Sequence, residues 1–143
     1  MPLIRTNRTI PTLLACVAIL LSGAAQAGVR EDQLAQYAST AKAETPGFVG
    51  FSAERGKTLH TQNFTGGKPD TPACTSCHGK DTRSTGRAPS GKTIDAMAVT
   101  VTTTRYTDPA KVEKWFKRNC TEVLGRVCTP QEKGDWLTFM LGQ

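Results

Sequence analysis

The sequence is poor in aromatic residues, which make up 6% of its 143 residues, and it has no internal repeat or low-complexity tract. The absence of repeats excludes repeat architectures. So few aromatic side chains predict a thin protein core, which a bound apolar group would complete. No segment shows the alternation of polar and apolar residues that predicts a strand, so we expect an all-α protein of helices and loops.

Also missing is a basic run interleaved with aromatic residues, although Lys and Arg outnumber Asp and Glu by 18 to 12. This absence argues against nucleic acid as a partner. The modest positive charge instead favours an acidic protein partner. The chain lacks the acid–base constellation that catalysis normally uses, because Lys117, Arg118 and Glu122 on a predicted helix are typical of a solvated face. We therefore expect that the protein is not an enzyme.

Residues 1–27 have the features of a cleavable export signal. Two arginines precede a short apolar run, and the segment ends in Ala25-Gln26-Ala27, the small-residue pattern of a cleavage site. We expect a signal peptide at residues 1–27 and one mature domain at residues 28–143, located in the periplasm. The alternative is a membrane anchor, but the apolar run is too short for a comfortable span, so we expect no membrane span after cleavage.

Four segments of the mature domain predict helices. Residues 31–44 place apolar side chains on one stripe. The other three are marked by residues typical of helix starts, which are Ser52, Asp108 with Pro109, and Thr129 with Pro130 and Glu132. Residues 78–107 have no helical period, which we expect of a long segment that packs against a bound cofactor.

The segment Cys74-Thr75-Ser76-Cys77-His78 is the attachment signature of a c-type haem. The two thiols form thioether bonds with the haem vinyl groups, and His78 then lies where its imidazole can bind the iron from the proximal side. Zinc would need a second cysteine pair nearby, and a redox dithiol would need a strand–helix setting. The motif therefore predicts one covalently bound haem c.

The remaining cysteines are accounted for by the predicted export. Cys16 leaves with the signal peptide, and Cys120 and Cys128 form the leftover pair. In an oxidising compartment such a pair predicts a disulfide, with two free buried thiols as the alternative.

Several residues are candidates for the distal side of the iron. Methionine is the usual sixth ligand of small electron-carrier cytochromes, but Met97 follows His78 too closely to travel easily around the haem edge. Met140 has the spacing of a core residue on the last predicted helix. His60 precedes the motif, and its expected role is that of a structural histidine, with iron ligation as the alternative.

Asn119 lies on the same predicted helix face as Val112, Trp115 and Phe116, at positions i, i+3, i+4 and i+7. We expect the two aromatic residues to pack near the haem. A polar amide on this inward face needs a partner, because an unpaired buried polar group costs free energy. The iron is one such partner. Capping of the helix C-terminus or a bond to backbone is the other interpretation.

Two segments resemble the sphaeroides haem protein family of class I-like cytochromes c. They are "GGKPDTPACTSCHG" at residues 66–79 and "RYTDPAKVEKWFKRNCTEVLGRVCTPQEKGDWL" at residues 105–137, and the resemblance extends over nearly the whole mature chain. It implies a small cytochrome c-type fold around one haem. The residues that it implies for the site are Cys74, Cys77 and His78 on the haem, Asn119 as sixth ligand, and a disulfide between Cys120 and Cys128.

The resemblance also implies a function. An amide is a poor iron ligand, so Asn119 should hold ferric iron weakly and release ferrous iron, which then binds O2, NO or CO. Electrons would come from a dihaem cytochrome c or a membrane b-type cytochrome. The chain departs from the family pattern at His60, where an aromatic residue is expected, and in the loop after Ile94, which lacks prolines. An ordinary methionine-ligated carrier and a small haem oxidase or peroxidase-like enzyme are the alternatives.

Overall fold

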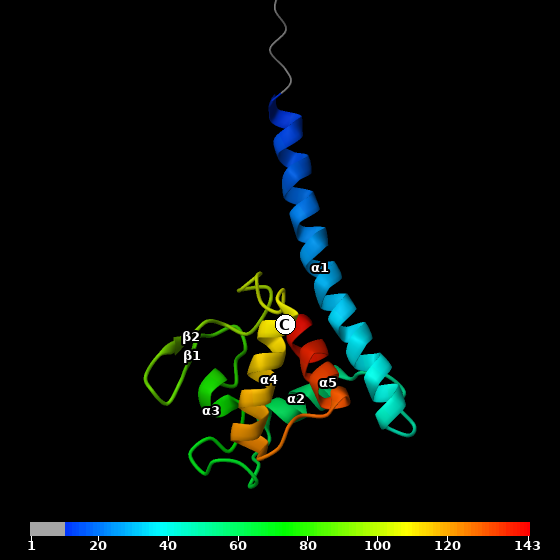
Figure 1. Cartoon of the computed structure of the whole chain (residues 1–143). Helices are drawn as coiled ribbons and strands as arrows, with labels where there is room; N and C mark the ends of the chain where they lie inside the picture. Colours follow the sequence, from blue (N-terminus) through cyan, green and yellow to red (C-terminus); the bar gives the residue numbers. More distant parts are fainter. Residues whose placement is uncertain (1–10) are drawn as a thin grey trace, which may run out of the picture.

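The computed structural model describes the backbone of residues 11–143 and the side chains from Gly28 onward. The first helix, α1 (Pro11–Glu44), is long and reaches well beyond the remaining elements (Figure 1). The predicted signal peptide, residues 1–27, lies outside the residues whose side chains are described, and its cleavage stays a prediction. Within the described part of the chain, no helix combines the length and hydropathy needed to cross a membrane.

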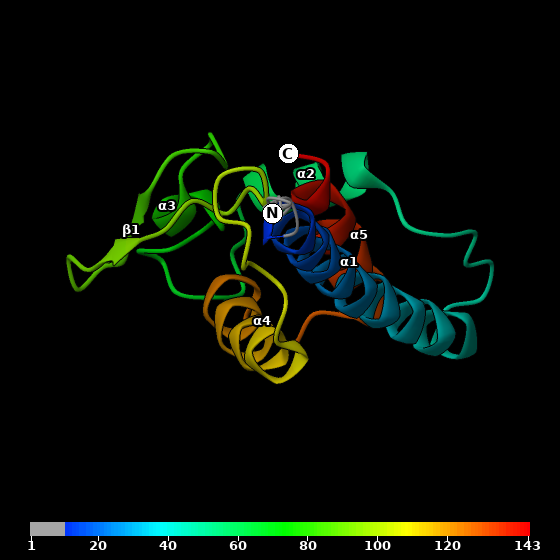
Figure 2. The same cartoon turned by 90° about the horizontal axis from the view of Figure 1, so that it is seen from above.

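Two helices lie beside the C-terminal helix, α5 (Pro130–Leu141), as the view from above shows (Figure 2). Both α1 and α2 (Ala53–Thr61) pack closely against it. The approach of α2 depends on Gly56, because a Cβ atom there would lie 2.1 Å from the carbonyl oxygen of Asp135. Only glycine permits this backbone contact.

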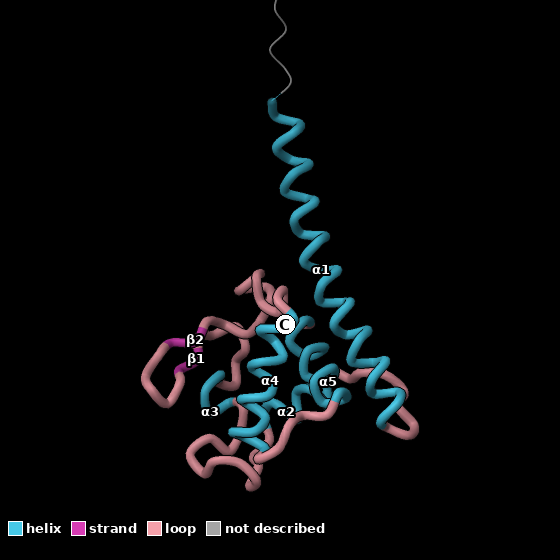
Figure 3. Tube along the Cα trace, in the orientation of Figure 1, coloured by secondary structure: helices cyan, strands magenta, loops and turns pink. Residues whose placement is uncertain are grey.

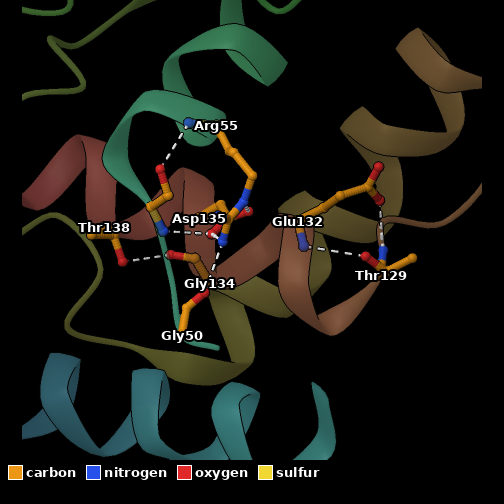
Figure 4. Close-up of polar contacts among 8 residues, drawn as sticks. Gly50, Arg55, Thr129, Glu132, Gly134, Asp135 and Thr138 are labelled. Atoms are coloured by element: carbon orange, nitrogen blue, oxygen red, sulfur yellow. Dashed lines mark hydrogen bonds and ion pairs between the residues drawn. The ribbon is translucent and has the colours of Figure 1, made fainter. Parts of the chain in front are cut away.

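Three predicted helix starts are confirmed, whereas the helix predicted over residues 31–44 is the C-terminal part of α1. Ser52 caps α2, and Asp108 caps α4 (Pro109–Leu124), each through its side chain. At the start of α5, Thr129 and Glu132 form the reciprocal capping box (Figure 4). The same view shows Arg55 of α2 reaching Asp135 of α5, with 2.7 Å between Nε and Oδ2. Local polar groups thus fix where the helices begin, and one ion pair joins two of them.

Residues 79–107 are mostly loop, as predicted (Figure 3). The structure adds a minimal antiparallel sheet that the sequence did not predict, formed by β1 (Gly86–Arg87) and β2 (Thr93–Ile94), with Gly86 opposite Ile94. Two-residue strands are too short to show an alternating pattern, which explains the missed prediction. The fold is otherwise all-α, in agreement with the prediction.

A partly buried network joins α1, α4 and α5. The hydroxyl of Tyr37 donates to Glu113, and Lys133 Nζ donates to the other carboxylate oxygen of Glu113 at 2.7 Å. Burial raises the pKa of the Glu113 carboxyl, but the hydrogen bonds from Lys133 and Tyr37 outweigh burial and leave this pKa below its usual value of 4.5. The ionised carboxylate therefore stabilises the packing of the three helices.

Replacing Glu113 should change how stability depends on pH. A depressed pKa in the folded state gives stability that is present above about pH 4.5 and is lost as pH falls through the folded pKa. Glu113→Gln should therefore lower the free energy of unfolding at neutral pH. The loss should be at most roughly 1 kcal/mol, because the side chain is partly exposed. It should be smaller in acid, where the wild-type carboxylate is itself protonated. Urea denaturation at both pH values measures this.

Glu54→Gln is the matched control, since Glu54 is exposed on α2. Equal losses from Glu113→Gln at neutral and acidic pH would contradict a stabilising carboxylate.

Candidate haem-binding site

The attachment motif forms a single helical turn, α3 (Thr75–His78), with Cys74 as its N-cap residue. Gly79 ends the turn with a φ of 72°, in the left-handed region that favours glycine, and its N–H donates to the Thr75 carbonyl. Both thiols, of Cys74 and Cys77, are free and half-buried. The turn thus presents two unpaired thiols and the imidazole of His78 from one short segment.

Burial controls the chemical state of these side chains. It raises the pKa of Cys74 to about 11 and also raises the pKa of Cys77, so both thiols stay protonated. Burial is the main cause that lowers the pKa of His78 to about 4, and the neighbouring His60 and Arg105 lower it further. Its imidazole is therefore neutral, which is the state that binds iron.

These residues fit a covalently attached haem. The buried Nδ1 of His78 has no hydrogen-bond partner among the described residues, so its ring is not committed to the protein core. Apolar side chains also stay exposed in the described part of the chain, including Trp115 at 43% and Val101 at 54%. When bound, haem supplies a large apolar surface and an iron atom, and His78, Cys74 and Cys77 would hold it.

The structure places His60 away from any ligand role. Its side chain is fully buried, with 0% exposure. Its Nδ1 accepts a hydrogen bond from Trp136 Nε1 at 3.3 Å, and its Nε2 lies 3.3 Å from the carbonyl oxygen of Gly79. Because both ring nitrogens are engaged, neither has a free lone pair for iron. Trp136 follows His60 by 76 positions, so no local sequence pattern signals this contact.

Asn119 lies within α4, which continues to Leu124 and ends at Gly125, a cap with a φ of 75°. Asn119 therefore does not cap the helix, and that interpretation of its role is wrong. Its side chain is half-buried and forms no hydrogen bond with a residue that the structure describes. It shares a helix face with Trp115, four positions earlier. The amide thus lies in an apolar stripe without a partner in the described protein.

Met97 and Met140, the methionines in the described part of the chain, belong to the core. Met140 has 0% exposure, as predicted from its spacing. Met97 is 6% exposed, and its backbone is tied in place because Tyr106 donates a hydrogen bond to its carbonyl oxygen and Met97 N–H donates to Thr82. These bonds hold the loop after Ile94, which lacks prolines, against neighbouring segments.

The two aromatic residues that were predicted to pack near the haem differ in environment. Phe116 is buried and makes edge contacts with Tyr37 and Trp136, so it belongs to the core between helices. Trp115 is partly exposed, with the guanidinium of Arg118 over its ring at 5.4 Å. Only Trp115 is therefore open to contact with a bound group.

Cys120 and Cys128 form a disulfide in the structure, with 5.6 Å between their Cα atoms. It closes the turn between α4 and α5, immediately after Asn119. A closed loop of this length should stabilise the fold by roughly 2–3 kcal/mol.

The chain is similar to characterised proteins. Residues 46–140 match the family model described as "Domain of unknown function (DUF1924)". Cytochrome c'' of Methylophilus methylotrophus is 32% identical over 135 residues, which cover 92% of this chain and 94% of that protein. The cytochrome c-type protein SHP of Cereibacter sphaeroides is 52% identical over 91 residues, which cover 64% of this chain and 70% of that protein. The chain belongs to the sphaeroides haem protein family.

Solved structures agree with this family assignment. Oxidised SHP, described as "an oxygen binding cytochrome c", has a TM-score of 0.72 and 45% identity, covering 80% of this chain and 96% of that one. Oxidised cytochrome c'' has a TM-score of 0.71 and 30% identity, covering 81% and 95%. The predicted family and cytochrome c-type fold are confirmed. As a member of the sphaeroides haem protein family, the chain is a c-type cytochrome with covalently bound haem c.

Removing the thiols should remove the covalent attachment. Cys74→Ser and Cys77→Ser should each keep haem through the remaining thioether, whereas the double variant should lose the haem mass in denaturing solvent. Intact mass spectrometry measures this directly. As a control, replacing both Cys120 and Cys128 by Ser should leave the haem mass in place. Loss of haem mass from that control, or its retention by the double variant of the motif, would contradict the assignment of the thioether bonds.

Proposed function

We propose that this cytochrome carries electrons in the periplasm and that its ferrous haem binds O2, NO or CO beside a weak axial ligand, Asn119. The observation that carries the proposal is the unpartnered amide of Asn119 on the apolar stripe of α4. The proposed protein holds one haem and acts as a carrier and gas-binding protein rather than as an enzyme.

Ligand strength connects the amide to gas binding. A thioether or imidazole holds both oxidation states of iron firmly, whereas an amide is a poor donor, especially to softer ferrous iron. Reduction should therefore release Asn119 and open a position beside it. The freed amide N–H can donate a hydrogen bond to a diatomic molecule held there, because it has no competing partner among the described residues.

The relatives support oxygen as one such ligand. The solved structure of SHP, at 45% identity, is described as that of an oxygen-binding cytochrome c. The export signal predicted at residues 1–27 and the disulfide between Cys120 and Cys128 support an oxidising compartment. The single attachment motif supports one haem for each chain. The intact mass of the exported protein tests both the haem number and the predicted first residue, Gly28.

The charge distribution supports an acidic redox partner, such as a dihaem cytochrome c or a membrane b-type cytochrome. A groove of about 550 Å³ lies along the outer side of α4 and is lined by several cationic side chains. Lys68 in this groove pairs with Glu122, whereas Lys114 and Lys117 form no ion pair with a described residue. Such a surface raises the rate at which an acidic protein associates.

Substitution of Asn119 tests the ligand assignment. The wild-type protein should be high-spin when ferric and should bind CO when ferrous. Asn119→Met should give low-spin spectra in both states and block CO, because a thioether is the stronger ligand. Asn119→Ala should keep the site open but release O2 about tenfold faster, through loss of one hydrogen bond. Absorption spectra and stopped-flow kinetics measure these changes.

Asn63→Ala is the matched control, since Asn63 is an exposed asparagine. A low-spin ferric spectrum that survives Asn119→Ala and disappears in Met97→Leu would instead make the protein an ordinary methionine-ligated carrier. Turnover of peroxide or O2 clearly above that of free haem would make it an enzyme.

Charge reversal tests the groove. The double variant Lys114→Glu and Lys117→Glu should slow reduction by an acidic dihaem cytochrome c about tenfold at low ionic strength, and the difference should vanish in high salt. Stopped-flow reduction rates across ionic strengths measure this. A double variant of exposed lysines outside the groove, Lys57→Glu and Lys92→Glu, changes net charge equally. Equal slowing by both double variants would contradict a role for this groove.

A further inference from the structure

His60 is a fully buried histidine that neither the haem attachment nor the proposed distal chemistry explains. It lies in the last turn of α2 and has 0% exposure. Aromatic rings surround it, with the Trp136 and Phe139 centroids at 6.2 Å and 6.0 Å from its own. An apolar side chain would fill this position at lower desolvation cost, so the polar atoms of the imidazole need an explanation.

The partners of the ring fix its tautomer. Trp136 Nε1–H can only donate a hydrogen bond, so His60 Nδ1 must accept it and carries no proton. The proton of the neutral ring is therefore on Nε2, which donates to the carbonyl oxygen of Gly79 at 3.3 Å. Burial lowers the pKa of His60, in agreement with a neutral ring. In this tautomer Nδ1 accepts a hydrogen bond and Nε2 donates one.

The acceptor of this hydrogen bond is the residue that directly follows the proximal ligand. The N–H of Gly79 closes the haem-bearing turn by donating to Thr75, and its carbonyl oxygen accepts from His60. The His60 and His78 rings lie near each other, with centroids 6.4 Å apart. The chain from Trp136 through His60 to Gly79 therefore connects the α2–α5 core to the segment that holds the iron.

We propose that His60 is a positioning residue that fixes the orientation of the haem-bearing turn and, through it, the plane of the His78 imidazole. The consequence for gas binding rests on the function proposed above. If Asn119 released ferrous iron as proposed, His78 would be the remaining protein ligand, and a residue that orients its ring would then have a larger effect on the site.

Two variants separate hydrogen bonding from packing at this position. His60→Phe keeps an aromatic ring of similar size among Trp136 and Phe139 but removes both hydrogen bonds. His60→Gln keeps an N–H that can reach the Gly79 carbonyl. Leu59→Val is the control, because Leu59 is a buried neighbour on α2 whose side chain has no polar atom.

The readout is the proton NMR spectrum of the haem methyl groups in the ferric holoprotein with bound cyanide. The order and spread of these four resonances depend on the orientation of the axial imidazole plane. We expect His60→Phe to change their order, His60→Gln to restore the wild-type order, and Leu59→Val to leave it unchanged. Thermal unfolding of the same samples records the stability of each variant separately.

Wild-type methyl order in His60→Phe, or an equal change in Leu59→Val, would overturn the proposal and leave His60 with a packing role. If His60→Phe yields no holoprotein, Trp136→Phe breaks the same chain at its other end. It should alter the methyl spread, and an unchanged spectrum would again overturn the proposal.

The NMR test of His60 does not depend on which residue binds the distal side of the iron. If wild-type ferric protein takes no cyanide and the ferrous form takes no CO, the proposed gas binding fails. The methyl resonances of the unmodified ferric protein then report the same imidazole orientation in every variant, so the role of His60 is still decided.

Discussion

The close crossing of α2 and α5 at Gly56 is the constraint on which the rest of the structure depends. A side chain there would collide with the backbone of Asp135, so the two helices could not approach as closely with another residue. The crossing brings His60, one turn further along α2, against Trp136. From there a hydrogen bond reaches Gly79 at the end of the haem-bearing turn. A contact without any haem ligand thus sets where the haem is held.

The residues expected on the proximal and distal sides of the haem differ in burial and in ligand strength. On the proximal side, burial keeps His78 neutral and both thiols of the motif protonated. Among the described residues no cluster of histidine, cysteine and acidic side chains could hold a metal ion by itself. A covalently bound haem c would bring its own iron to the residues of this motif.

In the proposed mechanism, neither of the two described methionines binds the iron. Met140 is enclosed in the core, and Met97 is held by hydrogen bonds to its backbone. The half-buried amide of Asn119 instead lies on a stripe beside the partly exposed Trp115. A weak ligand is useful only when a stronger one does not replace it, and in the proposed mechanism the hydrogen bonds at the Met97 backbone would keep that side chain in the core. In the proposed mechanism, gas binding therefore requires that the loop containing Met97 stays in place.

What the sequence determined by itself is local. The N-caps at Ser52, Asp108 and Thr129 and the attachment motif at residues 74–78 were predictable, because each is encoded within a few neighbouring residues. The cysteine count also predicted the disulfide between Cys120 and Cys128, and the family resemblance favoured Asn119 among the candidate sixth ligands. The two-residue strands were missed because so short a pairing leaves no periodic signal.

Only the tertiary structure decided the surroundings of the site. Sequence spacing placed Trp115 and Phe116 on the same helix face. In the structure Phe116 packs in the core and Trp115 stays partly exposed. The reason is that the neighbouring helices cover only one side of α4. The bond between His60 and Trp136 joins residues 76 positions apart. Such contacts depend on how helices cross, and crossing is set by the summed packing of many side chains rather than by any short pattern.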